Sequence, residues 1–447
     1  MRTTNTFTSI IGAAIVITLQ CSGAPAAEPV HTRLFENDGK TCYRTPALVV
    51  STKGTLVAVS NACDSPPTKE STHAAIVARR STDGGKTWGP MRTVLDAKNR
   101  RIKTGAGVVD PSTGEIMFFC AAWPRPQTPK PGEVSEERII QSRAPWRTGW
   151  TPSGLAEQHD APEDKPDTDF IDEYVGYGIL RSKDDGATWR FAMADIKGPQ
   201  GAAGGHRLYS FINTAGSDTG IAIRSGSRKG RLLVPVLAAA DQRALYDYLH
   251  PKKMRVPWMQ RAPYFPYCAT AIHSDDHGKT WRAGGFGSPM AAESCVAELP
   301  DGSVYLNAAA SGGWRVKCRS KDGGSTWDRF ALSRLRDGHS GCAGSIVSVP
   351  RESGSPCLVL TAPAHNESGF DSRRDRKKFT ASVSFDGGKT WPVQKLINEG
   401  PSGYSASVIG KNGGISILYE KGEKVYYDKG VSIVRLDREW LLTAEDK

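Results

Sequence analysis

An eight-residue turn that occurs five times constrains the fold of this chain more than any other feature. It reads STDGGKTW at 81–88 and returns as SKDDGATW (182–189), SDDHGKTW (274–281), SKDGGSTW (320–327) and SFDGGKTW (384–391). The shared pattern is Ser-x-Asp-x-Gly-x-x-Trp, with Asp185 and His277 among its variants. In such a turn the Asp accepts hydrogen bonds from nearby backbone amides, and the Gly accepts a positive φ. We interpret the repeat as structural and expect the chemistry elsewhere.

The segments around these turns predict an all-β fold. Apolar runs such as AAIVARR before the first turn and KFTASV before the last are typical of strands. The turns start at 81, 182, 274, 320 and 384, so the intervals are 101, 92, 46 and 64 residues. The shorter intervals suit one four-stranded blade, and the longer two suit two blades or one blade with a large insertion. A closed ring of such sheets protects its strand edges, which favours a β-propeller.

The N-terminus predicts export. Residues 1–27 combine Arg2, an apolar run at 10–19 and small residues at 24–26, as in a signal peptide. We expect residues 28–447 to form one domain without a transmembrane segment, secreted or periplasmic. Lipid attachment at Cys21 is not expected, because residues 18–20 are a poor lead-in to a lipidated cysteine.

Charge and cysteine usage narrow the partners. The 447 residues carry a formal charge of +11, but Lys and Arg are dispersed and no nucleic-acid-binding motif is present. We therefore expect an acidic glycan or cell surface as partner, and no nucleic acid. Eight cysteines follow Cys21, and an even number in an exported chain favours disulfides, with Cys42 and Cys63 one plausible pair. The full pairing and the oligomeric state stay open.

Four further stretches carry a resemblance to a known family. They are CYRTPALVV (42–50), MAAESCVAELPDGSVYLN (290–307), RKKFTASVSFDGG (376–388) and GYSASVIGKNGGISILYE (403–420). With the five turns, called Asp boxes or BNR repeats, they resemble the sialidase (neuraminidase) family of glycoside hydrolases from about residue 33 to 437. The resemblance implies a six-bladed β-propeller with an active site on its central axis. It also implies an exo-α-sialidase that cleaves terminal sialic acids from sialylated glycans and needs no cofactor and no metal.

The resemblance also implies roles for individual residues. Tyr404 matches the nucleophile and Glu293 its base, in a retaining mechanism with a tyrosyl-enzyme intermediate. A neutral phenol suits this role, because a carboxylate nucleophile would be repelled by the carboxylate that sialic acid carries beside its anomeric carbon. Arg44 and Arg376 match the first and third of three arginines that bind this carboxylate. The forked guanidinium donates two parallel hydrogen bonds to such a group.

The sequence departs from the family pattern at two places. The second arginine is expected just after Asn307, but Ala309 stands there, and Arg315 matches a different arginine that we keep as a substrate-binding candidate. Losing one such contact costs about 1.5–3 kcal/mol, the value of a hydrogen bond to a charged group.

The general acid is the second departure. The family has an Asp in the loop before the first Asp box, where this chain reads CDSPPTKESTHAAIVARR (63–80). Asp64 has the right type but stands early, Glu70 has the better spacing, and His73 could also donate a proton. We favour Glu70 over Asp64.

Two insertions and two alternative functions complete the predictions. Residues 124–173 predict a long surface loop, and 246–267 predict either a proline-rich connection or an aromatic rim beside the site. The alternatives to a sialidase are a related hydrolase of another ulosonic or acidic sugar, and a catalytically impaired glycan-binding propeller. The observation that separates them is whether Arg44, Glu293, Arg376 and Tyr404 converge.

Overall fold

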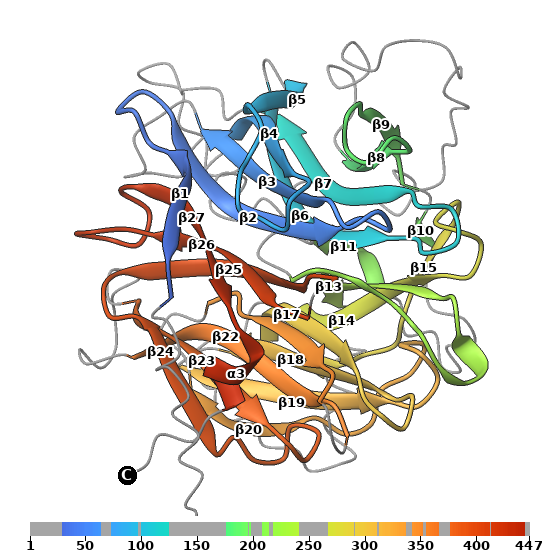
Figure 1. Ribbon diagram of the computed structural model, residues 1–447. Coiled ribbons are helices and arrows are strands. Elements are labelled where there is room, and N and C mark those ends of the chain that lie inside the picture. The colour runs from blue at the N-terminus through green and yellow to red at the C-terminus, as the bar shows by residue number, and fades with distance from the viewer. Residues whose placement is uncertain are drawn as a thin grey trace, which may run out of the picture.

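The computed structural model forms six antiparallel sheets arranged as a ring (Figure 1). The described residues are 29–63, 73–96, 100–124, 176–194, 196–197, 208–213, 218–240, 267–289, 291–310, 313–336, 342–351, 355–365, 376–411 and 413–442. The predicted all-β, six-bladed propeller is confirmed. The predicted signal peptide lies outside the described residues, as do 125–175 and 241–266 of the insertions.

Each sheet is one blade, and we number the blades in chain order. Blade 1 holds β2 (Cys42–Val50), β3 (Leu56–Cys63), β4 (His73–Ser81) and β5 (Arg92–Asp96). Blade 2 holds β6 (Arg100–Val109), β7 (Ile116–Pro124), β8 (Gly176–Ser182) and β9 (Arg190–Met193). Blade 3 holds β10 (Ile196–Lys197), β11 (Leu208–Asn213), β12 (Ile221–Ala222), β13 (Leu232–Ala240), β14 (Tyr267–Ser274), β15 (Trp281–Ala283) and β16 (Ser288–Pro289), with the 3-10 turn η3 (Gly226–Arg228).

The second half of the chain continues the same pattern. Blade 4 holds β17 (Ala291–Glu298), β18 (Val304–Ala310), β19 (Trp314–Ser320) and β20 (Ala331–Arg336). Blade 5 holds β21 (Ser345–Val349), β22 (Cys357–His365), β23 (Lys377–Ser384) and β24 (Val393–Asn398). Blade 6 holds β25 (Ser402–Ile409), β26 (Ile415–Lys421) and β27 (Gly430–Leu436), followed by the short helix α3 (Arg438–Leu442).

The N-terminal strand closes the ring. β1 (His31–Glu36) pairs antiparallel with β27, with His31 opposite Val434 and Glu36 opposite Gly430. In Figure 1 the blue β1 lies beside the red β27, so both ends of the described chain build blade 6. This pairing closes the ring of described sheets, and closure is how propellers protect their sheet edges.

Apolar clusters fill the spaces between neighbouring blades. Among the described residues each of the six interfaces has its own cluster of buried side chains. At the interface of blades 2 and 3, for example, the ring of Trp281 meets the ring of Phe119 edge-on at 4.8 Å between centroids. Because alternate residues of every strand face one neighbour or the other, both faces of each sheet are covered.

Every Asp box connects the third and fourth strands of a blade. The five boxes follow β4, β8, β14, β19 and β23, one in each of blades 1 to 5. The two long intervals therefore each span one blade with an insertion, after β7 in blade 2 and after β13 in blade 3. Blade 6 has no such turn, because its third strand is β27 and its fourth strand, β1, comes from the other end of the chain.

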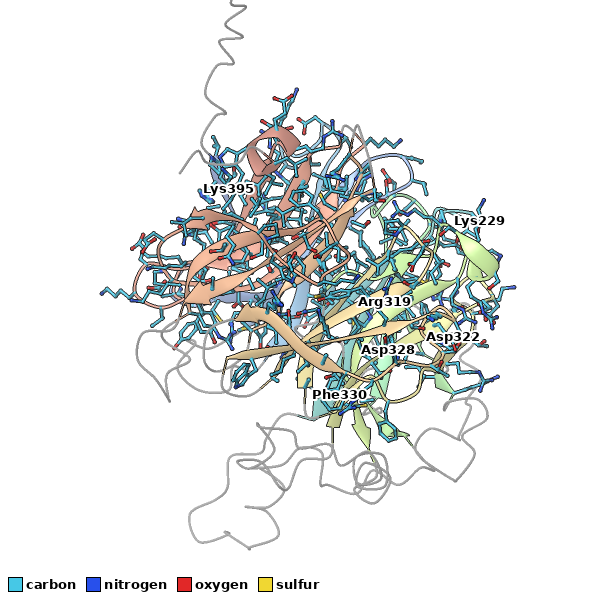
Figure 2. All side chains as sticks on the ribbon, turned by 90° about the horizontal axis from the view of Figure 1, so that it is seen from below. Lys229, Arg319, Asp322, Asp328, Phe330 and Lys395 are labelled. Atoms are coloured by element: carbon cyan, nitrogen blue, oxygen red, sulfur yellow. The ribbon has the colours of Figure 1, made fainter. Side chains whose placement is uncertain are left out.

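The hydrogen bonds of the boxes explain their sequence pattern. In the last box Ser384 Oγ donates to Asp386 Oδ1 at 2.8 Å and accepts from the Gly388 amide at 2.8 Å, while Thr390 donates to Asp386 through its amide and its hydroxyl. The same bonds recur around Asp322 of the fourth box, labelled in Figure 2 close to Asp328. The box is thus a self-contained turn that needs no ligand.

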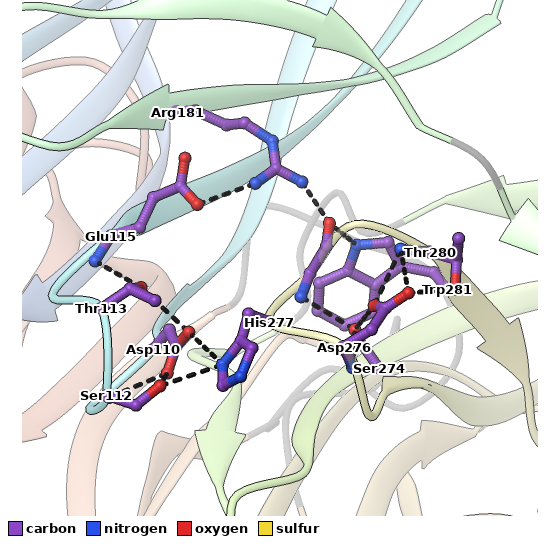
Figure 3. A network of polar contacts seen from close by, with 11 residues as sticks. Asp110, Ser112, Thr113, Glu115, Arg181, Ser274, Asp276, His277, Thr280 and Trp281 are labelled. Atoms are coloured by element: carbon purple, nitrogen blue, oxygen red, sulfur yellow. Dashed lines mark hydrogen bonds and ion pairs between the residues drawn. The ribbon is translucent and has the colours of Figure 1, made fainter.

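The boxes also join each blade to the one before it. Gly388 has a φ of +80, and a Cβ at this position would lie 2.5 Å from the Tyr305 ring of blade 4. Figure 3 shows the third box, where His277 Nδ1 lies 2.9 Å from Asp110 Oδ2 of blade 2 and Arg181 donates to the Gly278 carbonyl. The structural interpretation of the repeat therefore extends to contacts between blades.

The predicted disulfides are not shown by this structure. No disulfide joins the eight cysteines among the described residues, although Cys42 and Cys63 stand opposite each other on β2 and β3, so the pairing stays a prediction. All eight are buried, and burial raises the pKa of Cys120, Cys268 and Cys295 to about 12. They act as small apolar core residues. Among the helices described, none is long and apolar enough to cross a membrane.

Candidate active site

The candidate site lies where the first strands of the blades meet. β2, β6, β17 and β25 are each the edge strand of their sheet, and β2 packs against both β6 and β25, which places these strands around the centre of the ring. Near the start of each strand one side chain is partly exposed and is followed by a buried residue. These side chains are Arg44, Lys103, Glu293 and Tyr404. The ring therefore presents four polar side chains at the same level.

Tyr404 and Glu293 form the central contact. The Tyr404 hydroxyl donates a hydrogen bond to Glu293 Oε1, although the two residues lie in blades 6 and 4. Burial and the Glu293 carboxylate raise the pKa of Tyr404 well above its ordinary value, while Arg376 opposes this shift. The phenol is therefore protonated in the resting protein, with a carboxylate in place to accept its proton.

Glu293 is held in an unusual backbone conformation. Its φ is +49, and the register between β17 and β18 shifts between Ala292 and Ser294, so Glu293 occupies a β-bulge. A non-glycine residue pays about 1–2 kcal/mol for the left-handed region. The bulge redirects one side chain without disturbing the rest of the strand, which is a common use of bulges next to active sites.

Glu420 fixes the position of Arg44. This carboxylate is fully buried, and its Oε1 accepts from Arg44 Nε at 3.1 Å and from the Thr45 amide at 3.1 Å. Its Oε2 accepts from the Tyr404 amide at 3.2 Å. Burial acts to lower the pKa of Arg44, but Glu420 together with Tyr426 and Tyr404 outweighs it and raises that pKa. Glu420 thus positions both the arginine and the backbone of the tyrosine.

Arg376 approaches the same tyrosine from blade 5. It directly precedes β23, is buried, and its Cζ lies 5.3 Å from the Tyr404 ring centroid and 4.9 Å from that of Tyr426. Arg44 Cζ lies 6.0 Å from the Tyr404 centroid and 5.2 Å from that of Tyr426. Both guanidinium groups therefore stand next to the same two rings, as in cation–π pairs.

Arg44, Glu293, Arg376 and Tyr404 thus converge, coming from four different blades. Two guanidinium groups beside a phenol and a carboxylate form an arrangement that suits displacement at an acidic sugar. Their catalytic roles remain predictions.

Arg315 takes a different place. Its side chain is fully buried on β19, where Nε donates to Asn307 Oδ1 at 2.5 Å and Nη1 donates to the Cys342 carbonyl at 3.1 Å. The first bond lies within blade 4, and the second links blade 4 to blade 5. Ala309 lies directly opposite Arg315 and is 4% exposed. The geometry therefore gives Arg315 a role in holding two blades together and leaves no arginine at position 309.

Two of the candidates for the general acid, Asp64 and Glu70, lie outside the described residues, and the third, His73, begins β4 without a described side chain. Among the described residues, no group of three or more His, Cys, Asp or Glu side chains is placed to hold a metal ion.

Sequence reasoning missed two residues of the site. Glu420 ends one of the stretches that carry the resemblance, and Tyr426 lies in the turn after β26. The glutamate that ends the apolar pattern ISILYE was the available signal, because a carboxylate placed in a buried strand requires a charged or hydrogen-bonding partner.

Comparisons with known proteins agree with this geometry. The model of the BNR repeat-like domain family matches residues 165–417. A sialidase from Micromonospora viridifaciens is 28% identical over 420 residues, covering 90% of this chain and 54% of that protein. A sialidase from Bacteroides fragilis is 27% identical over 410 residues, covering 88% of this chain and 62% of that protein. The chain thus spans little more than half the length of these relatives.

A solved structure gives the same fold. The Hadza microbial sialidase Hz136 superposes with a TM-score of 0.60 at 23% identity, covering 90% of this chain and 66% of that chain. At this identity the likeness shows the shared fold.

Proposed function

The chain belongs to the BNR repeat-like domain family, and on that premise we propose that it is a sialidase-type glycoside hydrolase. In finer terms it is an exported exo-α-sialidase that releases terminal α-linked sialic acids from glycoconjugates with retention of configuration. The observation that carries this proposal is the hydrogen bond between Tyr404 and Glu293 beside the guanidinium groups of Arg44 and Arg376.

Substrate binding rests on the two arginines. The carboxylate of the sugar receives hydrogen bonds from Arg44 and Arg376, both of which stay charged at any physiological pH. Glu420 has its oxygens engaged with Arg44, Thr45 and Tyr404, so it orients Arg44 without blocking the approach of an anion.

The covalent step uses the neighbouring pair. Tyr404 Oη attacks the anomeric carbon, its proton passes to Glu293, and the bond to the leaving oxygen breaks as that oxygen takes a proton from the general acid. Water then attacks the same carbon, gives a proton to the general acid and releases Tyr404, which recovers its proton from Glu293. Because each step inverts the centre, the product retains the original configuration. Glu70, or else Asp64, supplies the general acid in this proposal.

A second candidate follows from Ala309. With no arginine at this position, the chain suits an acidic sugar that differs from the common sialic acids, such as another ulosonic acid. A panel of α-glycosides of several ulosonic acids separates the two candidates by their kcat/KM values.

The experiment is fluorescence release from the methylumbelliferyl α-glycoside of a sialic acid. The unaltered protein is expected to release fluorophore, and both Tyr404→Phe and Glu293→Gln are expected to lose at least about a hundredfold in kcat, the lower range for a general base. Tyr419→Phe is the matched control, because it removes another buried phenol hydroxyl, one that contacts His31 Nδ1 at 3.0 Å.

Two results count against the proposal. Full activity in Tyr404→Phe would remove the tyrosyl mechanism while leaving a glycosidase. No release by the unaltered protein from any glycoside of the panel would remove the hydrolase and leave the glycan-binding alternative, which equilibrium binding to sialylated glycans would then test.

A further inference from the structure

Lys103 lies on the inner strand of blade 2 at a position equivalent to that of the site residues on their strands. It is the fourth residue of β6, partly exposed, between the buried residues Ile102 and Thr104. The register of β6 with β7 shifts immediately afterwards, between Thr104 and Gly107. Corresponding shifts follow Arg44 in β2 and surround Glu293 in β17. Blade 2 therefore presents Lys103 where blades 1 and 4 present Arg44 and Glu293.

A buried hydrogen bond fixes the part of β6 around Lys103 against blade 1. The Thr104 amide donates to Asn61 Oδ1 at 2.9 Å, and Asn61 is fully buried. Asn61 is itself the cross-strand partner of Arg44 on β3. Since Lys103 directly precedes Thr104, its backbone is anchored beside that of Arg44.

The charges around Lys103 agree with this placement. Burial and then Arg44 lower the pKa of Lys103, while the carboxylates of Glu293 and Glu420 act in the opposite direction. Lys103 therefore lies within electrostatic reach of both carboxylates of the site and of its first arginine.

The charges of the described site residues indicate what the ammonium group of Lys103 could do. Glu420 is fully buried against Arg44, and Glu293 faces Tyr404, so these two carboxylates offset the charges of Arg44 and Arg376. Among the described residues of the site these four charges sum to zero, and burying the unpaired charge of an anionic sugar there is costly. Lys103 adds a third cation to this described set, which matches a sugar with one carboxylate.

We propose that Lys103 is a third cationic substrate-binding residue, which makes up for the arginine absent at Ala309 by binding the anionic group of the sugar. This inference rests on the proposed function of the site. It assigns to blade 2 a contact that the family resemblance placed on blade 4.

The test compares a charged and an uncharged ligand. Calorimetric titration uses the 2,3-unsaturated glycal of sialic acid, which carries the carboxylate, and its methyl ester, which does not. Lys103→Met is expected to weaken binding of the acid roughly ten- to a hundredfold, the range for one hydrogen bond to a charged group, and to leave binding of the ester unchanged. Lys103→Arg keeps the charge and is expected to retain most of the affinity for the acid.

Two further measurements separate binding from folding. Lys317→Met is the matched control, because Lys317 on β19 of blade 4 is also a partly buried lysine. Its Nζ donates to the Gly388 carbonyl at 2.7 Å. It is expected to leave the affinity for both ligands unchanged. Thermal unfolding reports whether Lys103→Met folds, and Lys103→Gln replaces it in the titrations if it does not. For the substrate, the variant is expected to raise KM with little change in kcat.

Each contrary outcome has a distinct meaning. An unchanged affinity for the acid, or an equal loss for acid and ester, would overturn the role of Lys103 while the proposed function stands. Failure of the unaltered protein to bind either ligand would overturn the proposed function and this inference with it.

Discussion

Asp218 offers a test of how burial changes the pKa of a carboxyl group and, through it, the stability of the fold. This fully buried residue precedes β12 in blade 3 and is bonded to blades 4 and 5. Its backbone amide donates to the Ser294 carbonyl at 3.1 Å, and its Oδ2 accepts from the Ile346 amide at 2.6 Å. Its Oδ1 accepts from Ser345 Oγ, which in turn accepts from the Ser407 amide at 2.6 Å. The perturbation is Asp218→Asn.

The expected magnitude follows from linkage. Burial raises the pKa of Asp218 from 3.8 to about 7, although the hydrogen bonds from Ser345 and Ile346 act to lower it. A carboxyl group whose pKa is higher in the folded state contributes stability that is complete below pH 3.8 and is lost as the pH rises to about 7. A shift of about three pKa units at about 1.4 kcal/mol each corresponds to about 4 kcal/mol across this window.

The assay is urea unfolding followed by tryptophan fluorescence between about pH 3.5 and 8, which covers the whole window. Asn keeps one acceptor for the Ile346 amide but does not ionise, so the variant is expected to gain stability relative to the unaltered protein as the pH rises, by up to about 4 kcal/mol. Asp437→Asn, at an exposed position, is the control and is expected to show no such trend. A difference between Asp218→Asn and the unaltered protein that stays constant with pH would refute the reasoning.

Two further substitutions separate the site from the frame. Glu420→Gln removes the charge that holds Arg44, so it is expected to raise KM for the acidic sugar and to lower the free energy of unfolding by roughly 1–3 kcal/mol, as measured by kinetics and urea unfolding; unchanged KM would contradict it. Asp386→Ala removes the bonds to Thr390 in the last Asp box and is expected to lower stability by about 1 kcal/mol with kcat unchanged. Hydrogen bonds from Thr390 and Ser384 outweigh burial and lower the pKa of Asp386 to about 2, so its contribution to the free energy of unfolding is present above pH 3.8 and is lost toward pH 2. Unfolding of both proteins at decreasing pH checks this loss. A lower kcat in the variant would contradict the structural role of Asp386.

The fold was largely predictable because its signals are local. Each Asp box is closed by bonds among Ser, Asp, Gly and Thr within eight residues, so the same letters return wherever the same turn is built. The number of blades was harder to read from the spacing, because residues 125–175 and 241–266 lengthen two blades. The sixth blade leaves no such signal, since its outer strands β27 and β1 are not connected in sequence.

The site was predictable only where chemistry and motif coincide. Tyr404, Glu293, Arg44 and Arg376 were singled out, and the structure brings their side chains together. The position of Glu420 depends on the pairing of β25 with β26, which no local pattern reveals.

Lys103 and the cysteines show the same limit in two forms. Lys103 stands next to Arg44 only because blades 1 and 2 are neighbours in the ring, anchored through Asn61. The disulfides were predicted from the even number of cysteines, whereas the structure shows where the eight lie: all are buried in the packing between strands. Non-local packing therefore supplied what the sequence pattern lacked.

The outer and inner strands of each blade differ in their roles, and this difference explains how the fold tolerates strained residues at the candidate site. Thr45, Glu293 and Lys378 all have positive φ and lie in or beside the site, at a cost of about 1–2 kcal/mol each. Such strain persists only where the surroundings determine the backbone strongly. Here the Asp boxes fix the turns between the outer strands, and the apolar clusters fix the blades against one another. The inner strands can then form bulges that turn single side chains toward the centre. The repeated turns thus support the candidate site indirectly, because they stabilise the frame that holds its strained residues.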